Sequence, residues 1–342
     1  MATTALPQPA APYAIVPIAN QRQFGLDEGA SSSAVVVQLV PCGQAADDRS
    51  AIYALVKRLD ENKGDAPFLF RRERAALKAA LATPALATLV PPLLHADWPT
   101  LTLTVAYVPY PSLARFRAWA HAEGQVTDVG SLFRSLMLQL GARLLEAVAL
   151  LATHGLAHGD IKPENVLYQP ETGDFRLIDF GFALSASVSQ GGGGGDLVRR
   201  GHALASPLYA APEVLGRTES LLADYHVPTA DCWSVGMTVF DALCNRQPFE
   251  PPVSSISALR RAVWKPLDLA GHARGLAHHE AACLQVVLVI DPKARADPHA
   301  LAQRWWALLE QQAKKNTEVE ATTGDVNSTR TSPPSPSSSL VM

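Results

Sequence analysis

The hydrophobic pattern of the chain changes character once, between Tyr107 and Leu113, and this change constrains the fold most. Before it, short β-branched runs at 33–37 and 101–105 predict strands, and one helix is expected from about Phe68 to Leu81. After it, apolar residues recur at helical spacing, as at 133–152, 233–243 and 301–309. The pattern predicts an α+β fold in two lobes, a small β-rich lobe followed by a larger and mainly helical one.

The two ends of the chain differ in composition from its middle. Residues 1–12 are rich in Ala and Pro and are expected to be flexible. From about Lys314 onward Thr, Ser, Pro and Gly dominate, which predicts a disordered tail, because such a segment buries too little apolar surface to order itself. The expected division is a flexible terminus at 1–12, a small lobe at 13–107, a large lobe at 108–311 and a disordered tail at 312–342.

Charge and cysteine usage narrow the class of protein. With 342 residues and a formal net charge of −3, the chain lacks the overall positive charge that drives nucleic-acid binding, and no nucleic-acid partner is expected. Its four cysteines lie far apart, which indicates reduced thiols and an intracellular protein, cytoplasmic or nuclear; import into an organelle stays open. No membrane span is expected, because the apolar segment 132–156 is interrupted by Arg134, Arg143 and Glu146.

The residues that point to chemistry form two short motifs in fixed order. His158-Gly159-Asp160-Ile161-Lys162-Pro163-Glu164-Asn165 is followed by Asp179-Phe180-Gly181. Phosphoryl transfer needs a carboxylate to accept the hydroxyl proton, a cation near the phosphoryl group and oxygen ligands for Mg²⁺. Asp160, Lys162, and the pair Asn165 and Asp179 supply these groups. Either motif alone would equally suit a turn in which Asp and Asn cap helices.

Together the two motifs resemble the protein kinase family, with its H-R-D-x-K-x-x-N loop and D-F-G motif. The resemblance implies Asp160 as the base, Lys162 as the phosphate-facing cation, and Asn165 and Asp179 as Mg²⁺ ligands. His158, Phe180 and Gly181 would have structural roles.

Three later segments extend the resemblance over roughly residues 20 to 311. Residues 209–213 resemble the A-P-E end of a kinase activation segment, 231–236 the D-x-W-S-x-G start of a central helix, and 291–295 the segment whose arginine pairs with the A-P-E glutamate. The resemblance implies that Asp231 accepts backbone amides of the catalytic loop. It also implies an ion pair between Glu213 and Arg295.

The same resemblance implies a nucleotide site in the small lobe. Lys57 fits the strand lysine that contacts the phosphates, and Glu73 fits the helix glutamate that orients it. An exposed strand lysine and a solvated helix charge are the ordinary alternatives. Adenine would meet the backbone of Ala106 and Val108, after a gatekeeper at Val105. The remaining ATP-binding positions would lie in and beside the glycine-rich loop, at Leu26, Gly29 and Ala34.

The chain departs from the family pattern at several positions. The glycine-rich loop keeps only Gly29, and Leu55 replaces the usual adenine-facing alanine. Gly159 replaces the catalytic-loop arginine that reads activation-loop phosphorylation in the family, so switching by a loop phosphate is less expected. The loop before Lys57 and the segment between Glu213 and Asp231 are longer than usual.

The favoured function is an ATP- and Mg²⁺-dependent Ser/Thr protein kinase. Lys162, with Ser206 in the position of the family's threonine, resembles the Ser/Thr branch, so the expected partner is a protein with a Ser or Thr acceptor; a regulatory partner is compatible with the insertions. One alternative is a catalytically weak pseudokinase scaffold. The other is a small-molecule phosphotransferase, because relatives of that kind use H-G-D with a downstream Asn.

Overall fold

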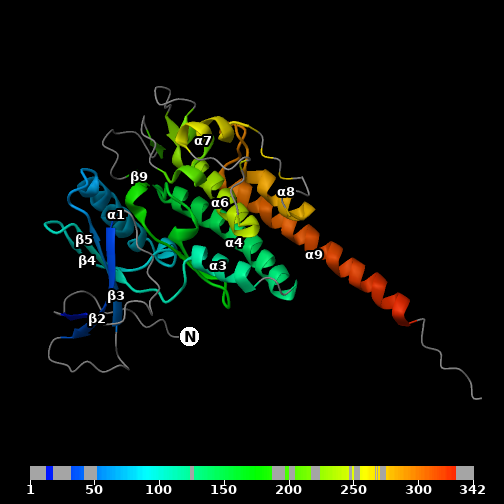
Figure 1. Ribbon diagram of the computed structural model, residues 1–342, viewed down its shortest axis with the longest axis horizontal. Helices are drawn as coiled ribbons and strands as arrows, with labels where there is room; N and C mark the ends of the chain where they lie inside the picture. Colours follow the sequence, from blue (N-terminus) through cyan, green and yellow to red (C-terminus); the bar gives the residue numbers. More distant parts are fainter. Residues whose placement is uncertain are drawn as a thin grey trace, which may run out of the picture.

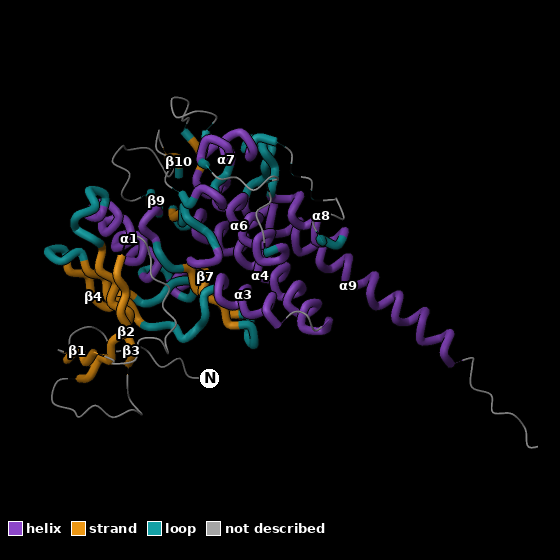
Figure 2. The backbone as a smooth tube through the Cα atoms, viewed as in Figure 1, coloured by secondary structure: helices purple, strands orange, loops and turns teal. Residues whose placement is uncertain are grey.

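The two halves of the chain fold into two lobes joined by the segment around Tyr107 (Figure 1). The computed structural model describes residues 13–17, 32–41, 52–123, 127–186, 197–199, 205–216, 224–245, 249, 255–265, 267, 269 and 275–328. In Figure 2, which colours helices and strands differently, the five-stranded sheet lies in one lobe and most of the helices lie in the other. The predicted two-lobed α+β architecture is therefore confirmed.

The small lobe is one antiparallel sheet with a helix packed on it. Its strands lie in the order β1-β2-β3-β5-β4, and they are β1 (Tyr13–Pro17), β2 (Ser32–Pro41), β3 (Ile52–Leu59), β4 (Leu93–Asp97) and β5 (Thr102–Ala106). Helix α1 (Ala66–Leu81) packs on the sheet through Leu69 and Phe70, which meet Leu59 and Leu103 in one buried cluster. Proline near the start of α1 suits a first turn, where its missing N–H is not needed.

The large lobe contains most of the helices. They are α3 (Leu113–Glu123), α4 (Thr127–Thr153), α5 (Pro212–Leu215), α6 (Val227–Cys244), α7 (Ile256–Val263), α8 (His278–Val287) and α9 (Pro298–Ser328), and α2 (Pro84–Ala87) precedes them. Two-stranded ribbons pair β6 (Leu156–Ala157) with β9 (Leu184–Ser185), β7 (Val166–Gln169) with β8 (Asp174–Leu177), and β10 (Val198–Arg199) with β11 (Tyr225–His226). Short 3₁₀ turns are η2 (Pro163–Asn165), η3 (Phe180–Phe182) and η4 (Pro207–Tyr209).

A glycine lets α9 approach the centre of the large lobe. A side chain at Gly141 in α4 would begin 2.7 Å from the ring of Trp305, which is fully buried. The Trp305 indole nitrogen donates to the carbonyl of Leu138 at 2.9 Å, so its one polar atom is satisfied inside the core. The pair fixes α9 against the helix that leads into the catalytic loop.

One stretch among the described residues, Gly130–Thr153 in α4, is long and apolar enough to cross a membrane by length and composition. Its most apolar window is 61% buried inside the protein, where α4 packs on α6 and α9. The packing explains its hydrophobicity as that of a core helix.

The expected disordered tail at 312–342 is wrong for its first part. Helix α9 continues to Ser328 and projects away from the body of the protein (Figure 1). The docked part of the helix supplies the helix nucleus, so each further residue adds to a helix that already exists. The side chain of Gln312 also donates to that of Asn316, one turn later, at 2.8 Å. Residues 1–12 and 329–342 lie outside the described residues.

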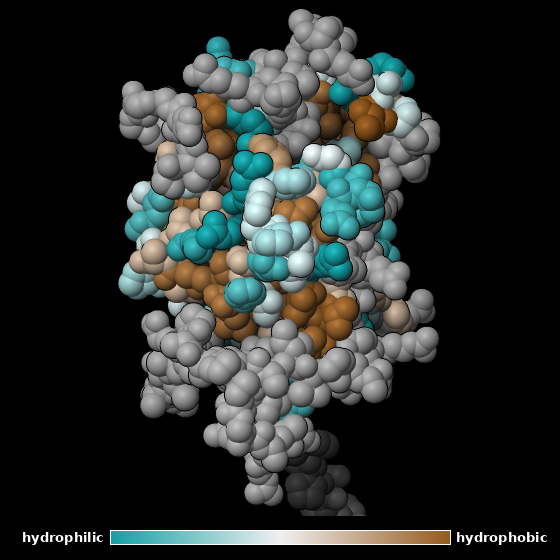
Figure 3. All heavy atoms as spheres, turned by 90° about the vertical axis from the view of Figure 1, so that its left-hand side faces the viewer, coloured by the Kyte–Doolittle hydropathy of each residue, from teal (hydrophilic) through white to brown (hydrophobic). Residues whose placement is uncertain are grey.

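The end of the small lobe presents apolar groups among polar ones (Figure 3). Phe68 on α1 and Trp98 after β4 are 43% and 47% exposed. Arg71 lies over the Trp98 ring at 4.9 Å, so a charged group covers part of this apolar surface.

Candidate active site

An ion-pair network joins the two lobes. The ammonium of Lys57 on β3 lies 2.9 Å from a carboxylate oxygen of Glu73 on α1 and 2.8 Å from one of Asp179 in the large lobe. Glu73 shares the buried face of its helix with Leu69 and Phe70, so packing of α1 aims the carboxylate at the lysine. The structure thus brings Asp179 to Lys57 and Glu73, which lie more than a hundred residues earlier in the sequence.

The charges of this network follow from burial and mutual attraction. Burial disfavours the Lys57 ammonium, but Glu73 and Asp179 outweigh it and raise the pKa of Lys57 above its ordinary value. Burial likewise tends to raise the pKa of Asp179, yet Lys57 holds it below the usual range. Glu73 is more deeply buried, and burial raises its pKa despite Lys57. Lys57 and Asp179 are therefore both charged at neutral pH, as phosphate and cation binding require.

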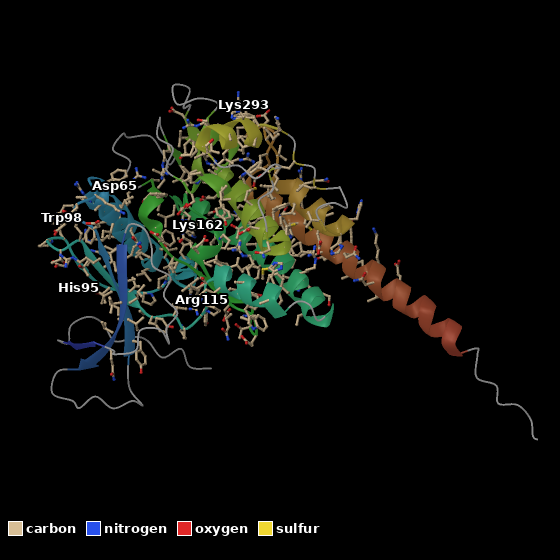
Figure 4. All side chains as sticks on the ribbon, viewed as in Figure 1. Asp65, His95, Trp98, Arg115, Lys162 and Lys293 are labelled. Atoms are coloured by element: carbon tan, nitrogen blue, oxygen red, sulfur yellow. The ribbon has the colours of Figure 1, made fainter. Side chains whose placement is uncertain are left out.

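Asp160 lies in the loop between β6 and η2 and is 7% exposed. Asn165 donates from its amide nitrogen to the carbonyl and a carboxylate oxygen of Asp160, at 2.9 and 3.0 Å. The Lys162 ammonium lies 3.0 Å from the same carboxylate. The 3₁₀ turn that begins at Pro163 returns Asn165 to this carboxylate, which explains the five-residue spacing. Figure 4 shows Lys162 near the junction of the two lobes.

A buried carboxylate, that of Asp231, holds the backbone of this loop. Asp231 at the start of α6 accepts the backbone N–H groups of His158 and Gly159, both at 2.9 Å. Burial raises the pKa of Asp231 to about 7, although these two amides and the charge of Arg199 act in the opposite direction. Such an anchor ties the catalytic loop to the central helix of the lobe.

The tautomer of His158 follows from its bonds. The Asp160 amide donates to Nδ1 at 3.2 Å, so Nε2 carries the proton and donates to the Ile178 carbonyl at 3.0 Å. Burial lowers the pKa of His158, which keeps the ring neutral. The ring also packs on Phe180 at 4.6 Å between centroids, and Phe180 is buried. His158 therefore links the catalytic loop to the strand end that carries Asp179.

Ser206 is the contact between the catalytic loop and the segment before α5. Its hydroxyl accepts from the Lys162 ammonium at 2.7 Å, and its backbone N–H donates to Asp160 at 2.9 Å. Farther on, Arg295 donates to both carboxylate oxygens of Glu213 at 2.7 and 3.3 Å. The chain from Ser206 to Glu213 is therefore fixed to the large lobe at both of its ends.

Asn165 and Asp179 fit a divalent cation bound with phosphates. The amide nitrogen of Asn165 is used by Asp160, which leaves its amide oxygen for a ligand role, and the Asp179 side chain is 44% exposed although Lys57 contacts it. Two oxygen donors suit Mg²⁺, which keeps several waters and takes further oxygens from the phosphates. Among the described residues there is no cluster of three or more His, Cys, Asp or Glu side chains suited to a metal.

The strand register places four residues of the expected nucleotide site on one face of the sheet. In β3, Lys57 lies opposite Ala34 of β2, and Leu55 lies opposite Val105 of β5. Directly opposed residues project on the same face, as do alternate residues along a strand, so these four side chains share a face. Leu55 therefore lies beside the expected gatekeeper.

The expected hinge is held on both sides. The Ala106 amide donates to the Pro92 carbonyl at 2.8 Å, and the Tyr107 amide donates to the Tyr53 carbonyl at 2.9 Å. Leu26 and Gly29 of the expected glycine-rich loop lie outside the described residues.

Two arrangements were not expected from the sequence. Arg117 of α3 bonds Asp241 of α6, which also accepts from the Tyr209 hydroxyl at 2.9 Å, and this network ties α3 to the segment before α5. Arg72 on α1 donates to the Ala183 carbonyl at 3.1 Å, across the two lobes. No local pattern marks either contact, because the partners are about a hundred residues apart.

Comparison with known proteins agrees with this site. The family described as protein kinase domain matches residues 101–307, which include the catalytic loop, Asp179, Glu213, Asp231 and Arg295. The match begins after Lys57 and Glu73, so their assignment rests on geometry.

Curated relatives carry kinase names and match parts of the chain. Calcium/calmodulin-dependent protein kinase cmkB of Emericella nidulans is 28% identical over 183 residues, 52% of this chain and 42% of the relative. Serine/threonine-protein kinase pim-2 of Danio rerio is 30% identical over 133 residues, 39% of this chain and 38% of the relative. CBL-interacting protein kinase 22 of Oryza sativa subsp. japonica is 40% identical over 111 residues, 32% of this chain and 23% of the relative. The chain spans less than half the length of each of these relatives. On the match to most of its large lobe, the chain belongs to the protein kinase family.

Proposed function

We propose that this protein is an active Ser/Thr kinase that transfers the γ-phosphoryl group of Mg·ATP to a protein hydroxyl. The observation that carries the proposal is the position of Asp160, which is held at once by Asn165, Lys162 and the Ser206 amide. A pseudokinase scaffold would not need these groups in hydrogen-bond contact. The bridge from Lys57 to both Glu73 and Asp179 supports the same conclusion, because it closes the small lobe onto the large one.

Each residue has a defined task in the proposed transfer. Asp160 accepts the proton of the acceptor hydroxyl while the new bond from oxygen to the γ-phosphorus forms and the bond to the ADP leaving oxygen breaks. Lys162 places its charge beside the transferring group, and Lys57 binds the phosphates of the nucleotide. Asn165 and Asp179 would hold Mg²⁺, which would supply positive charge against the charge that develops at the leaving oxygen.

A Ser/Thr acceptor is supported by Lys162 and Ser206. Their 2.7 Å contact leaves the lysine close to Asp160, where it can contact the transferring phosphoryl group and a small aliphatic hydroxyl. The name of one relative, serine/threonine-protein kinase pim-2, agrees with this class. We propose an intracellular location, cytoplasmic or nuclear; support comes from Cys232 and Cys283, which are buried free thiols.

The test is transfer of labelled γ-phosphate from Mg·ATP to three matched peptides that differ only in a Ser, Thr or Tyr acceptor. We expect transfer to Ser and Thr and little to Tyr, and none with Asp160→Asn. A small-alcohol acceptor series run beside them addresses small-molecule phosphotransfer. Absence of transfer to every peptide, with no thermal shift on adding Mg·ATP, would favour the scaffold and contradict the proposal.

Leu55→Ala tests the crowded face of β3. Removing the side chain opposite Val105 enlarges the space for adenine, so KM for ATP is expected to fall about threefold to tenfold, with kcat little changed. The measurement is KM for ATP at saturating peptide, and Val56→Ala, on the opposite face of the same strand, is the matched control. An unchanged or higher KM for ATP in Leu55→Ala would show that Leu55 does not limit nucleotide binding.

A further inference from the structure

Gly159 occupies a crowded position in the catalytic loop. Gly159 has a φ of +78°, and a Cβ built on it would lie 2.5 Å from the Phe182 carbonyl oxygen and 3.4 Å from a guanidinium nitrogen of Arg199. The space beside Gly159, where family members begin an arginine side chain, is therefore filled by a carbonyl and by an arginine from elsewhere in the chain. Glycine is the residue that permits both the φ value and this close approach.

Arg199 reaches this position from the activation segment, the stretch between Asp179 and Glu213. It lies in β10, opposite Tyr225 of β11, and is 4% exposed. Its guanidinium donates to the carbonyl oxygen of Phe182, the residue directly after the D-F-G motif. Its charge also favours the ionised form of Asp231, the anchor of the catalytic loop. The buried side chain of Arg199 therefore bonds the residue after D-F-G, lies beside Gly159 and favours the charge on Asp231.

A second arginine continues the same arrangement on the side of the small lobe. Arg72 of α1 donates to the carbonyl of Ala183, next to the Phe182 carbonyl that Arg199 binds. Burial, and then repulsion from Arg199, lower the pKa of Arg72 to about 10, so it is still charged at neutral pH. Two guanidinium groups therefore hold consecutive carbonyls after D-F-G, one from α1 and one from the activation segment.

We infer that Arg199 is a positioning residue that docks the activation segment onto the catalytic loop from within the chain, so that the active arrangement forms without a loop phosphate. This inference rests on the proposed kinase function. In a kinase with an arginine at the position of Gly159, that side chain can bind a phosphate added to the activation segment. Here the guanidinium belongs to the segment itself, and its bond to Phe182 already joins that segment to the D-F-G turn.

The kinetic experiment uses full-length protein freed of phosphate by a phosphatase, with its state checked by intact mass. The dephosphorylated wild type is expected to keep kcat within about twofold of untreated protein. Arg199→Ala is expected to lose roughly 10- to 100-fold in kcat, the factor associated with one buried charge-assisted hydrogen bond, while KM for ATP changes less than about threefold. Arg199→Lys should fall between the two, because lysine keeps the charge but not the planar fork. Arg304→Ala, which removes an exposed arginine of α9, is the matched control.

Chemical rescue separates a positioning role from a merely structural one. Guanidinium ion at tens of millimolar, far below its denaturing range, should restore part of kcat to Arg199→Ala and none to Asp160→Asn. Amide hydrogen exchange gives a readout that does not depend on activity. Peptides covering 156–162 and 179–185 should exchange faster in Arg199→Ala, slow again with guanidinium, and be unchanged in Arg304→Ala.

Three results would overturn the inference, and a fourth would separate it from the proposed function. Loss of more than about tenfold in kcat on dephosphorylation of the wild type would overturn the inference, because a phosphate would then be required. Wild-type kinetics and exchange in Arg199→Ala would overturn it as well, and so would a variant that guanidinium cannot rescue in either assay. If the wild type transfers no phosphate but the exchange pattern responds as expected, docking by Arg199 stands and the proposed kinase function fails.

Discussion

Asp160→Asn is expected to lower kcat about 1,000-fold or more, the largest effect of any single change in this site. General-base catalysis by a positioned carboxylate contributes on the order of 10²–10⁴, and an asparagine amide cannot take up the hydroxyl proton. The substitution keeps the side-chain shape, so the loop should stay folded and Mg·ATP should still bind. The asparagine amide keeps one acceptor oxygen, so it can accept from Asn165 or from the Ser206 amide, which bond different oxygens of the carboxylate.

The measurement pairs kcat with two controls of binding and folding. Nucleotide affinity by calorimetry and unfolding by denaturant should both stay near the wild-type values. Asp65→Asn, the same change at an exposed carboxylate before α1, should leave kcat unaltered. Normal turnover in Asp160→Asn would remove Asp160 from the role of base.

Arg295→Met is expected to destabilise the protein by about 3–5 kcal/mol, the cost of leaving a buried carboxylate without its partner. The Arg295 side chain is fully buried, and it donates to both oxygens of Glu213 and to the carbonyls of Thr229 and Val289. It also lies over the Trp233 ring at 5.3 Å. Methionine fills much of the volume but leaves Glu213 buried and unpaired.

Denaturant unfolding of Arg295→Met gives the free energy directly, and the double variant Glu213→Gln/Arg295→Met shows how much of the loss is the stranded charge. The double variant should recover about 1–2 kcal/mol, because a neutral amide is less costly to bury than a carboxylate. A single variant within about 1 kcal/mol of the wild type would show that this pair does not hold the activation segment.

The large-lobe part of the site was predictable because its residues lie close in sequence. Asp160, Lys162 and Asn165 occupy one loop, and their spacing is set by a single 3₁₀ turn. Lys57 and Glu73 were predictable in kind, since a strand followed by a helix carries them, but their contact with Asp179 depends on how the lobes close. Local pattern therefore identified the groups and left their assembly to tertiary structure.

The unexpected features arise from contacts between distant segments. Arg199 and Gly159 are forty residues apart, so the arginine that fills the space beside the glycine carries no local signature. For residues up to Ser328 the composition predicted disorder, but the structure has helix α9 there. The docked part of α9 supplies the helix nucleus, so the helix can extend. In both cases packing elsewhere in the chain decided the outcome.

The close approach at Gly159 also restricts the evolutionary paths open to this chain. Any side chain there meets the Phe182 carbonyl at 2.5 Å, so a mutation that introduces arginine would displace backbone before it could add a function. Loss of Arg199 alone would remove the guanidinium but leave the Phe182 carbonyl in place. A change to the common family pattern therefore needs the Phe182 backbone to move as well as Arg199 to be replaced, so descendants of this chain should keep glycine and arginine together.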